Sequence, residues 1–250
     1  MQNSSINSTR ATSTTYDSKL RDYMLSVYRE MGFALGISGF ISFFIGNDLK
    51  NLMTGEATIL PVSLLTSLYS APLSYIIMFA PFAIVMFMSF KINSLSPSGA
   101  RKALYAFASL MGLSMAGIFA IYTGSSIASA FLSTSIVLAG VSLWGYTTKK
   151  DITSWGSFLM MGVIALIIAS VINIFLGSGS LGFVVNIITV GIFTGLMAYD
   201  TQRIKTNYLS LRGQVPDAQL ESMGTMGALS MYINFINVFI SLLNLFGQRN

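Results

Sequence analysis

The chain has 250 residues, of which 53% are hydrophobic and only 9% are charged, whereas a soluble domain carries about 25% charged residues. It contains no Cys and no His, which excludes disulfides, thiolate metal sites, and the usual zinc ligand and general base. The net charge of +5 comes from basic residues between long apolar runs and is not a nucleic-acid signal. Those runs are continuously apolar over about 20 residues each, which predicts membrane-spanning helices rather than a barrel.

The first 30 residues divide into two segments. Residues 1–15 are rich in Ser, Thr and Asn, which predicts a disordered tail without the apolar core of a signal peptide. Residues 16–30 alternate charged residues with Leu20, Met24 and Val27. This spacing is typical of an amphipathic juxtamembrane helix that leads into the first span.

Residues 31–247 are predicted to form an all-α, seven-helix transmembrane domain. The expected spans lie at about residues 31–46, 71–90, 103–123, 126–146, 156–177, 181–200 and 227–246. Pro81 should kink the second span, and residues 47–70 form the longest outer loop. Short turns near Gly124 and Gly177 should make tight hairpins of spans three and four and of spans five and six.

Basic residues are distributed unequally between the two ends of these spans. With a cytoplasmic N-terminus, twelve of the 14 Lys and Arg residues lie on the cytoplasmic side, and only Lys50 and Arg249 lie outside. The excess of basic residues on the cytoplasmic side predicts an N-terminus inside and a C-terminus outside.

Small residues recur at helix-packing spacing. The positions are Gly32 and Gly36, Gly191 and Gly195, and Gly112, Ala116 and Gly117. Such residues let helices approach closely in lipid, so we expect close packing there. The alternative is that helices slide, or a pore narrows, at these positions.

Asp200 is the first functional candidate, because an Asp at the centre of a spanning helix costs roughly 2.5–3.5 kcal/mol and usually faces a bundle interior or a hydrated cavity. The alternative is that Asp200 only marks the end of the sixth span, paired with Arg203 in headgroup water. Glu30, at the start of the first span, is expected at the membrane interface.

The last span carries a polar stripe instead of charges. Asn234 and Asn237 share a helix face that Asn244 continues, and Ser230 and Ser241 extend it. The stripe could hold neighbouring helices together or line a hydrated cavity. Asn173 and Asn186 could meet it from the fifth and sixth spans.

Two motifs in these last spans resemble the paired signatures of the Bax inhibitor-1 family. They are Ala-Tyr-Asp-Thr-Gln-Arg-Ile-Lys at 198–205 and Leu-Ser-Met-Tyr-Ile-Asn-Phe-Ile-Asn-Val-Phe at 229–239. Further stretches at 111–114, 118–124, 144–151, 156–162 and 171–175 also agree, and the resemblance extends over residues 20–247. It implies a bacterial member with a central last helix wrapped by the other six.

The resemblance also implies an activity. Characterised relatives conduct a pH-sensitive calcium leak, sensed by one aspartate in the sixth helix and one in the seventh. Asp200 matches the first position, but Asn234 stands where many members carry Asp, so the sensor pattern is incomplete. A hydrogen bond from Asn234 would favour the charged form of Asp200 and burial the neutral form, and the sequence leaves this balance open.

Relatives can also hold the closed state with a basic residue in the second helix, but residues 72–90 contain none. Arg203 is the nearest substitute, and Tyr199 and Gln202 in the same motif are candidates to support such a latch. Asn237 is expected with Asn234 in the ion pathway. Asp200 would bind calcium only weakly and transiently, since calcium prefers several oxygen ligands, and no cofactor is implied.

Two functions follow from these expectations. One is a calcium or other cation leak across the bacterial inner membrane. The other, which the exposed tail would suit, is a binding modulator of a membrane-anchored AAA protease. No enzyme is expected: a serine protease needs a base and an aspartyl protease two aspartates. A retinal protein would need a Lys in the last span, and residues 227–247 have none.

Overall fold

The computed structural model describes the backbone of residues 2–91 and 94–250 and the side chains of residues 18–91 and 94–250. The tail predicted over residues 1–15 lies outside the residues whose side chains are described and stays a prediction. The helices are α1 (Gln2–Thr54), α2 (Val62–Tyr69), α3 (Leu73–Lys91), α4 (Pro97–Ile121), α5 (Gly124–Thr147), α6 (Trp155–Leu176), α7 (Gly179–Leu211) and α8 (Asp217–Phe246). Outside them, the described residues hold two isolated β-bridges and no strand.

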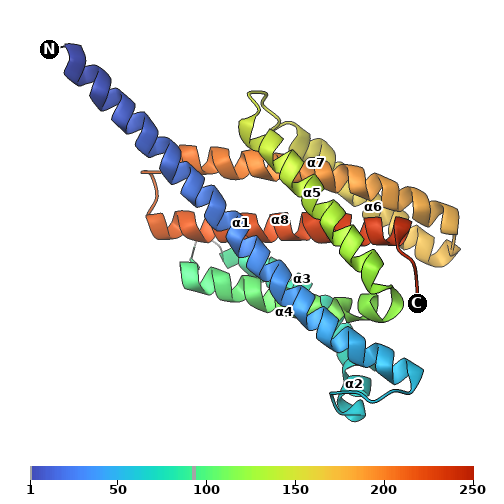
Figure 1. Cartoon of the computed structure of the whole chain (residues 1–250). Helices are drawn as coiled ribbons and strands as arrows, with labels where there is room; N and C mark the ends of the chain where they lie inside the picture. Colours follow the sequence, from blue (N-terminus) through green and yellow to red (C-terminus); the bar gives the residue numbers. More distant parts are fainter. Residues whose placement is uncertain (1, 92–93) are drawn as a thin grey trace.

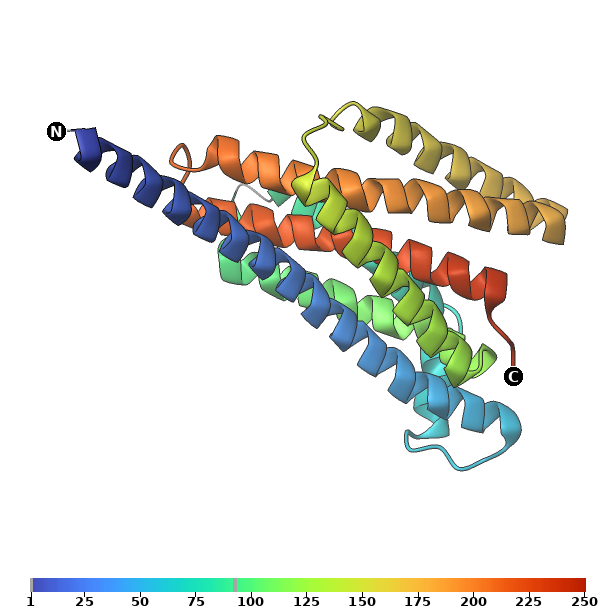
Figure 2. The ribbon, with the colours of Figure 1, turned by 45° about the horizontal axis from the view of Figure 1, so that its top comes forward.

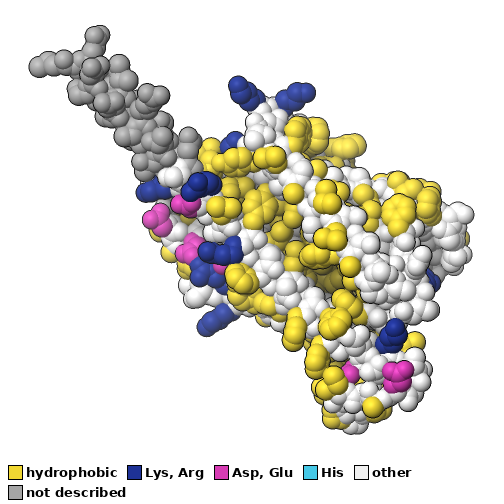
Figure 3. Space-filling model, viewed as in Figure 1, with side chains coloured by type: hydrophobic (Ala, Val, Ile, Leu, Met, Phe, Trp, Pro, Cys, Tyr) yellow, Lys and Arg dark blue, Asp and Glu magenta, His cyan; other side chains and the backbone are white. Residues whose placement is uncertain are grey.

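Seven of these helices are long and apolar enough to cross a membrane, namely α1 and α3 to α8. They correspond one to one with the seven predicted spans, so the prediction of an all-α, seven-helix membrane protein is confirmed. Apolar side chains cover much of the flank of the bundle, while charged side chains gather towards its ends (Figure 3). This distribution matches a protein whose flank is in contact with lipid.

The last helix, α8, lies at the centre of the bundle. Of the residues in its most apolar stretch, 67% are buried, against 11–28% for the other six spans. Its main contacts are with α1, α4, α5 and α7, while α6 packs on α7 and α3 packs on α4. In Figure 2, α7 lies between α6 and α8, and α8 lies between α7 and α4; the helix labels are given in Figure 1. The central position is confirmed, but four helices rather than six supply most of its surroundings.

Both predicted hairpin turns are present. Only two residues separate α4 from α5, and the Thr123 hydroxyl caps α5 by accepting a hydrogen bond from the Ser126 backbone N–H at 3.3 Å. The turn between α6 and α7 contains Gly177 at φ 60°, a left-handed conformation that glycine adopts without strain. The Ser178 hydroxyl then caps α7. These turns place α5 and α7 beside α8.

The loop between the first two spans is fastened to the bundle at two points. Asp48 is fully buried, and its carboxylate accepts hydrogen bonds from the backbone N–H groups of Ile59 at 3.0 Å and Leu60 at 2.7 Å. The Tyr69 hydroxyl, at the end of α2, donates to the Leu113 carbonyl at 2.8 Å. Burial raises the pKa of Tyr69 to about 12, so this hydroxyl keeps its proton at neutral pH.

The start of the first span packs more deeply than its sequence suggests. Leu20, Met24 and Val27 are buried in the core. Glu30, expected at the interface, is only 8% exposed because it is enclosed by other helices. Its carboxylate accepts a hydrogen bond from Tyr105 at 2.6 Å and pairs with Arg101 at 3.3 Å. These partners compensate the cost of removing the charge from water.

Some of the small residues lie at close helix contacts within this chain and others do not, so the expectation of close packing is only partly right. A Cβ added to Gly112 would lie 2.8 Å from the Ser38 carbonyl oxygen, and one added to Gly195 would lie 3.1 Å from the Leu159 side chain. Ala116 is likewise fully buried. Within this chain, nothing lies within 4 Å of a Cβ built at the remaining glycines of the set, Gly32, Gly36, Gly117 and Gly191.

Candidate functional site

Asp200 lies in the interior of α7 and not at its end. The helix continues to Leu211, because residues 201–211 contain neither Pro nor Gly and bury Ile204 and Tyr208 against the core. The Asp200 residue is only 3% exposed. The alternative that Asp200 marks the end of the helix is therefore wrong, although the pairing with Arg203 that it included is observed.

Both carboxylate oxygens of Asp200 are occupied by protein groups. Oδ2 accepts hydrogen bonds from the Ser230 hydroxyl at 2.5 Å and from the Asn234 amide at 2.8 Å. Ser230 and Asn234 are four residues apart on α8, so they present both donors on one face of the central helix. Oδ1 pairs with Arg203, one turn along α7, at 2.8 Å.

Arg203 connects this buried carboxylate to a cavity. Its side chain is 42% exposed, lies over the Tyr199 ring at 5.5 Å, and reaches the Ser230 hydroxyl at 3.5 Å. It also lines a cavity of about 400 Å³, together with Ser230, Ile233 and residues of α1 and α3. The guanidinium therefore has space into which it can move away from Asp200.

The two other residues of the α7 motif mainly hold α7 against its neighbours. The Gln202 amide donates to the Lys150 carbonyl at 2.8 Å and accepts from the Ile152 backbone N–H at 2.9 Å, which fastens the loop between α5 and α6. The Tyr199 ring lies so close to Gly156 of α6 that a Cβ there would be 2.6 Å from it. Tyr199 contacts the Arg203 guanidinium through its ring, whereas the hydrogen bonds of Gln202 go to the loop and not to Asp200.

The three Asn side chains of the polar stripe on α8 make hydrogen bonds to different partners. Asn234 binds Asp200, and the Asn237 amide donates to the Ile233 carbonyl of its own helix at 2.8 Å. Asn244 accepts from the Tyr122 hydroxyl at 2.9 Å and donates to Asn186 at 3.3 Å. The predicted meeting of Asn186 with the stripe is thus observed.

Asn173 and Asn237 make hydrogen bonds close to their own positions in the chain and not to Asp200. Asn173 accepts a hydrogen bond from the Ser178 backbone N–H at 3.2 Å, at the turn between α6 and α7. Asn237 makes its amide bond within α8 and not to Asp200. Of the three residues predicted for the ion pathway, the structure therefore joins Asp200 and Asn234 directly.

A second hydrogen-bonded group beside Asp200 has no counterpart in the sequence predictions. Thr201 is fully buried and shares a hydrogen bond of 3.0 Å with the Tyr28 hydroxyl. It lies 3.3 Å from the Ser142 hydroxyl of α5. In the sequence, Tyr28, Ser142 and Thr201 stand out only as hydroxyl residues near apolar ones, and this does not show that they are hydrogen-bond partners. The group connects α1, α5 and α7 next to the acidic residue.

The chemistry available at the site is limited. Among the residues with described side chains, no three His, Cys, Asp or Glu side chains come close enough to hold a metal ion. Asp200 therefore offers one carboxylate, surrounded by hydroxyl and amide groups, between two membrane helices. Such a group suits transient contact with a cation better than permanent coordination.

These features define a polytopic helical membrane protein with a buried carboxylate held against a central helix. The family profile described as inhibitor of apoptosis-promoting Bax1 matches residues 20–250, and the chain belongs to this Bax inhibitor-1 family.

Relatives cover nearly the whole chain. An uncharacterized protein of Caulobacter vibrioides is 40% identical over 92% of this chain and 90% of its own length. An uncharacterized protein of Rickettsia prowazekii is 37% identical over 96% of this chain and 95% of its own length. The inner membrane protein YbhL of Escherichia coli strain K12 is 33% identical over 92% of this chain and 93% of its own length.

Proposed function

We propose that this protein is a cation leak channel, with calcium as the permeant ion and Asp200 as its acidic site. The observation that carries the proposal is the buried carboxylate of Asp200, whose side chain is 4% exposed, between α7 and the central α8. A carboxylate oxygen is the kind of ligand that calcium prefers. A single carboxylate binds weakly enough to release the ion, which conduction requires.

The ion pair with Arg203 would represent the closed arrangement. Arg203 occupies Oδ1 of Asp200 at 2.8 Å, and α3 offers no basic residue except Lys91 at its end. Arg203 would therefore take the role that a basic residue of the second helix plays in relatives. A cation could reach Asp200 only after the guanidinium had moved into the adjoining cavity of about 400 Å³.

The relatives and the charge distribution support a place in the bacterial inner membrane. YbhL, which is 33% identical, is named an inner membrane protein. With the N-terminus in the cytoplasm, nearly all basic residues would lie on the cytoplasmic side, as orientation in membranes favours. The partners would then be a cation and the surrounding lipid bilayer.

Calcium flux into dye-loaded liposomes that carry the purified protein tests the proposal. Asp200→Asn should reduce flux to the level of empty liposomes, because the amide keeps the shape of the side chain but lacks its charge. Asp151→Asn is the matched control, since Asp151 is exposed in the loop between α5 and α6. Hydrogen bonds from Thr153 hold the pKa of Asp151 below its ordinary value, so this control also removes one negative charge.

Asn234→Asp should make the flux more sensitive to pH between about pH 6 and pH 8, because two adjacent carboxylates titrate as a coupled pair. The Asn234 amide lies 2.8 Å from Asp200 Oδ2, so the new carboxylate would face the existing one. The measurement is the same flux assay at several pH values, with wild type in parallel. Identical pH profiles for the two proteins would contradict this role of position 234.

If neither wild type nor any variant gives calcium flux above that of empty liposomes, the channel proposal is contradicted. The alternative is then a binding modulator of a membrane-anchored AAA protease, for which the Ser-, Thr- and Asn-rich residues 1–15 offer a contact segment. Co-purification of the full chain with such a protease, and its loss when these residues are deleted, would support the alternative.

A further inference from the structure

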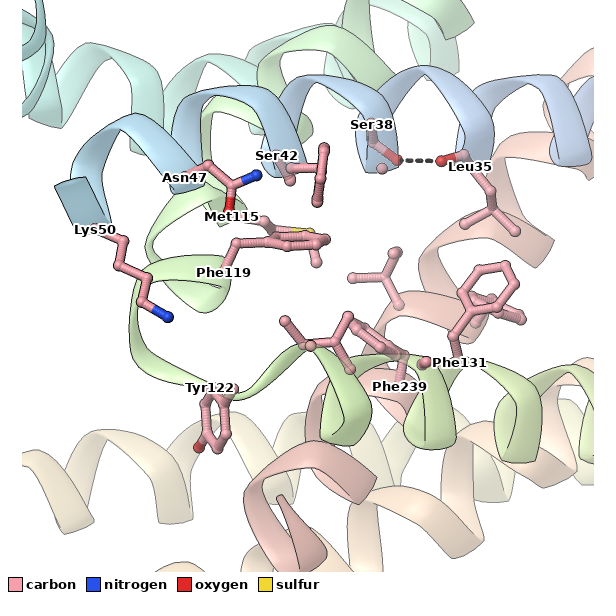
Figure 4. A pocket seen from close by; sticks show the side chains of 17 residues that line it. Leu35, Ser38, Ser42, Asn47, Lys50, Met115, Phe119, Tyr122, Phe131 and Phe239 are labelled. Carbon is pink, nitrogen blue, oxygen red and sulfur yellow. Dashed lines mark hydrogen bonds between the residues drawn. The ribbon is translucent and has the colours of Figure 1, made fainter. Parts of the chain in front are cut away.

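A second cavity, away from Asp200, lies near the C-terminal end of α1. It has a volume of about 400 Å³ and is lined by residues of α1, α4, α5 and α8. Figure 4 shows Lys50 and Asn47 at one end and aromatic rings such as Phe131 and Phe239 further along. The cavity is thus apolar along its length and carries one cation and one amide at one end.

The two serine hydroxyls on the wall of this cavity already have hydrogen-bond partners within the protein. The Ser38 hydroxyl donates to carbonyl oxygens of its own helix, with the Leu35 oxygen at 3.1 Å. The Ser42 hydroxyl donates to the Gly112 carbonyl of α4 at 2.7 Å. A ligand deep in the cavity would therefore meet mainly hydrocarbon surface, which excludes a sugar or another strongly polar molecule.

The length of the cavity matches one leaflet of a bilayer. Its lining extends along α1 from Lys50 to Leu35, 15 residues of helix or roughly 22 Å at 1.5 Å per residue. One leaflet, from the bilayer midplane to the outside of the headgroup region, is about 20–22 Å thick. Because α1 and α5 make little direct contact with each other, an extended acyl chain could enter between them from the lipid.

The charge at this end of the bundle is complementary to an anion. Lys50 and Arg249 are the two basic residues that the charge distribution places on this side of the membrane. In the part of the chain with described side chains, neither forms an ion pair with a carboxylate. Lys50 donates to the Asn250 amide oxygen at 3.3 Å, and Arg249 lies over the ring of Tyr122, a cavity residue. Nearby Asp48 is occupied by backbone N–H groups.

We propose that this cavity binds an anionic glycerophospholipid, with one acyl chain between α1, α4, α5 and α8 and the phosphate at Lys50. The amide of Asn47 would donate a second hydrogen bond to the phosphate. The proposal does not depend on ion conduction, because it concerns a different cavity and is tested by binding alone.

Quenching of a tryptophan in the cavity by brominated lipid tests this proposal. The reporter is Phe119→Trp in the full chain with both native tryptophans, Trp144 and Trp155, replaced by Phe. In nanodiscs, brominated phosphatidylglycerol should reach half-maximal quenching at a several-fold lower mole fraction than brominated phosphatidylcholine. Lys50→Gln should bring the two curves together, because it removes the cation that distinguishes the headgroups.

Two further variants separate this site from general lipid contact. Arg21→Gln removes a cation from the other end of α1, where Arg21 lines a different groove, and should leave the preference for phosphatidylglycerol intact. Gly39→Leu should reduce quenching by both lipids, since Gly39 lines the cavity and a Cβ there meets no atom within 4 Å. Coincident curves for the two lipids in the reporter protein would overturn the proposal. Loss of the preference in Arg21→Gln, or unchanged quenching in Gly39→Leu, would do the same.

Discussion

Calcium flux through the Arg203→Gln variant should be about five-fold higher than through wild type at the same protein density. Arg203 holds Asp200 Oδ1 at 2.8 Å, with its own side chain 42% exposed. Hydrogen bonds to charged groups contribute about 1.5–3 kcal/mol to stability, and exposed ion pairs contribute about 0–1 kcal/mol. This partly exposed pair should therefore stabilise the closed state by about 1 kcal/mol. Losing it shifts a closed-to-open equilibrium roughly five-fold.

The control for Arg203→Gln must remove a positive charge without touching the site. Lys150→Gln does so, because the Lys150 side chain is exposed at the same end of the bundle and only its backbone carbonyl contacts Gln202. Arg203→Lys, which keeps the charge, should give an intermediate flux, since Lys cannot reproduce the planar fork of Arg. A flux equal to or below wild type in Arg203→Gln, with the protein still folded, would show that Arg203 does not hold the channel closed.

The number and order of the membrane helices were predictable because hydropathy alone reports them. The apolar runs predicted seven spans, and the same seven helices are long and apolar enough to cross a membrane. Helix ends were less predictable. The sixth span was placed at residues 181–200, but α7 extends to Leu211, because its polar continuation buries Ile204 and Tyr208. Hydropathy does not detect a helix that leaves the apolar layer and continues.

The site was predictable only in part. The spacing of Asp200 and Arg203 along one helix suggested their pairing, and the family resemblance brought Asn234 to Asp200. The bonds from Ser230 to Asp200 and from Tyr28 to Thr201 depend on how two helices are rotated against each other. A single sequence carries no direct information on that rotation. Asn237 shares a face with Asn234, but its amide donates to the Ile233 carbonyl of its own helix, and its place in an ion pathway stays a prediction.

The glycine pairs illustrate the same limit. The spacing of Gly32 and Gly36 is that of a helix-packing motif, yet a Cβ at either position meets no atom of this chain within 4 Å. Gly112, which the spacing grouped with Ala116, does lie at a close approach of α1 and α4, where its carbonyl oxygen accepts a hydrogen bond from the Ser42 hydroxyl. Spacing identifies small residues, whereas the neighbouring backbone decides which of them must stay small.

Gly112→Ala should therefore destabilise the protein, by about 1–3 kcal/mol, as overpacking of a close contact usually does. The added Cβ would lie 2.8 Å from the Ser38 carbonyl oxygen and 2.9 Å from the Ile41 Cβ. These are backbone and inner side-chain atoms that cannot rotate away, so α1 and α4 would have to separate. Unfolding by SDS in mixed micelles measures the change.

Gly36→Ala is the matched control for this substitution, because it makes the same chemical change in a helix where the new Cβ meets nothing. It should leave stability unchanged or raise it by up to about 1 kcal/mol, since Ala favours helix over Gly. The difference between the two variants isolates the contact between α1 and α4 from helix propensity. Equal stabilities would show that α1 and α4 can separate at this point without cost, and the close approach at Gly112 would then not hold the first span in place.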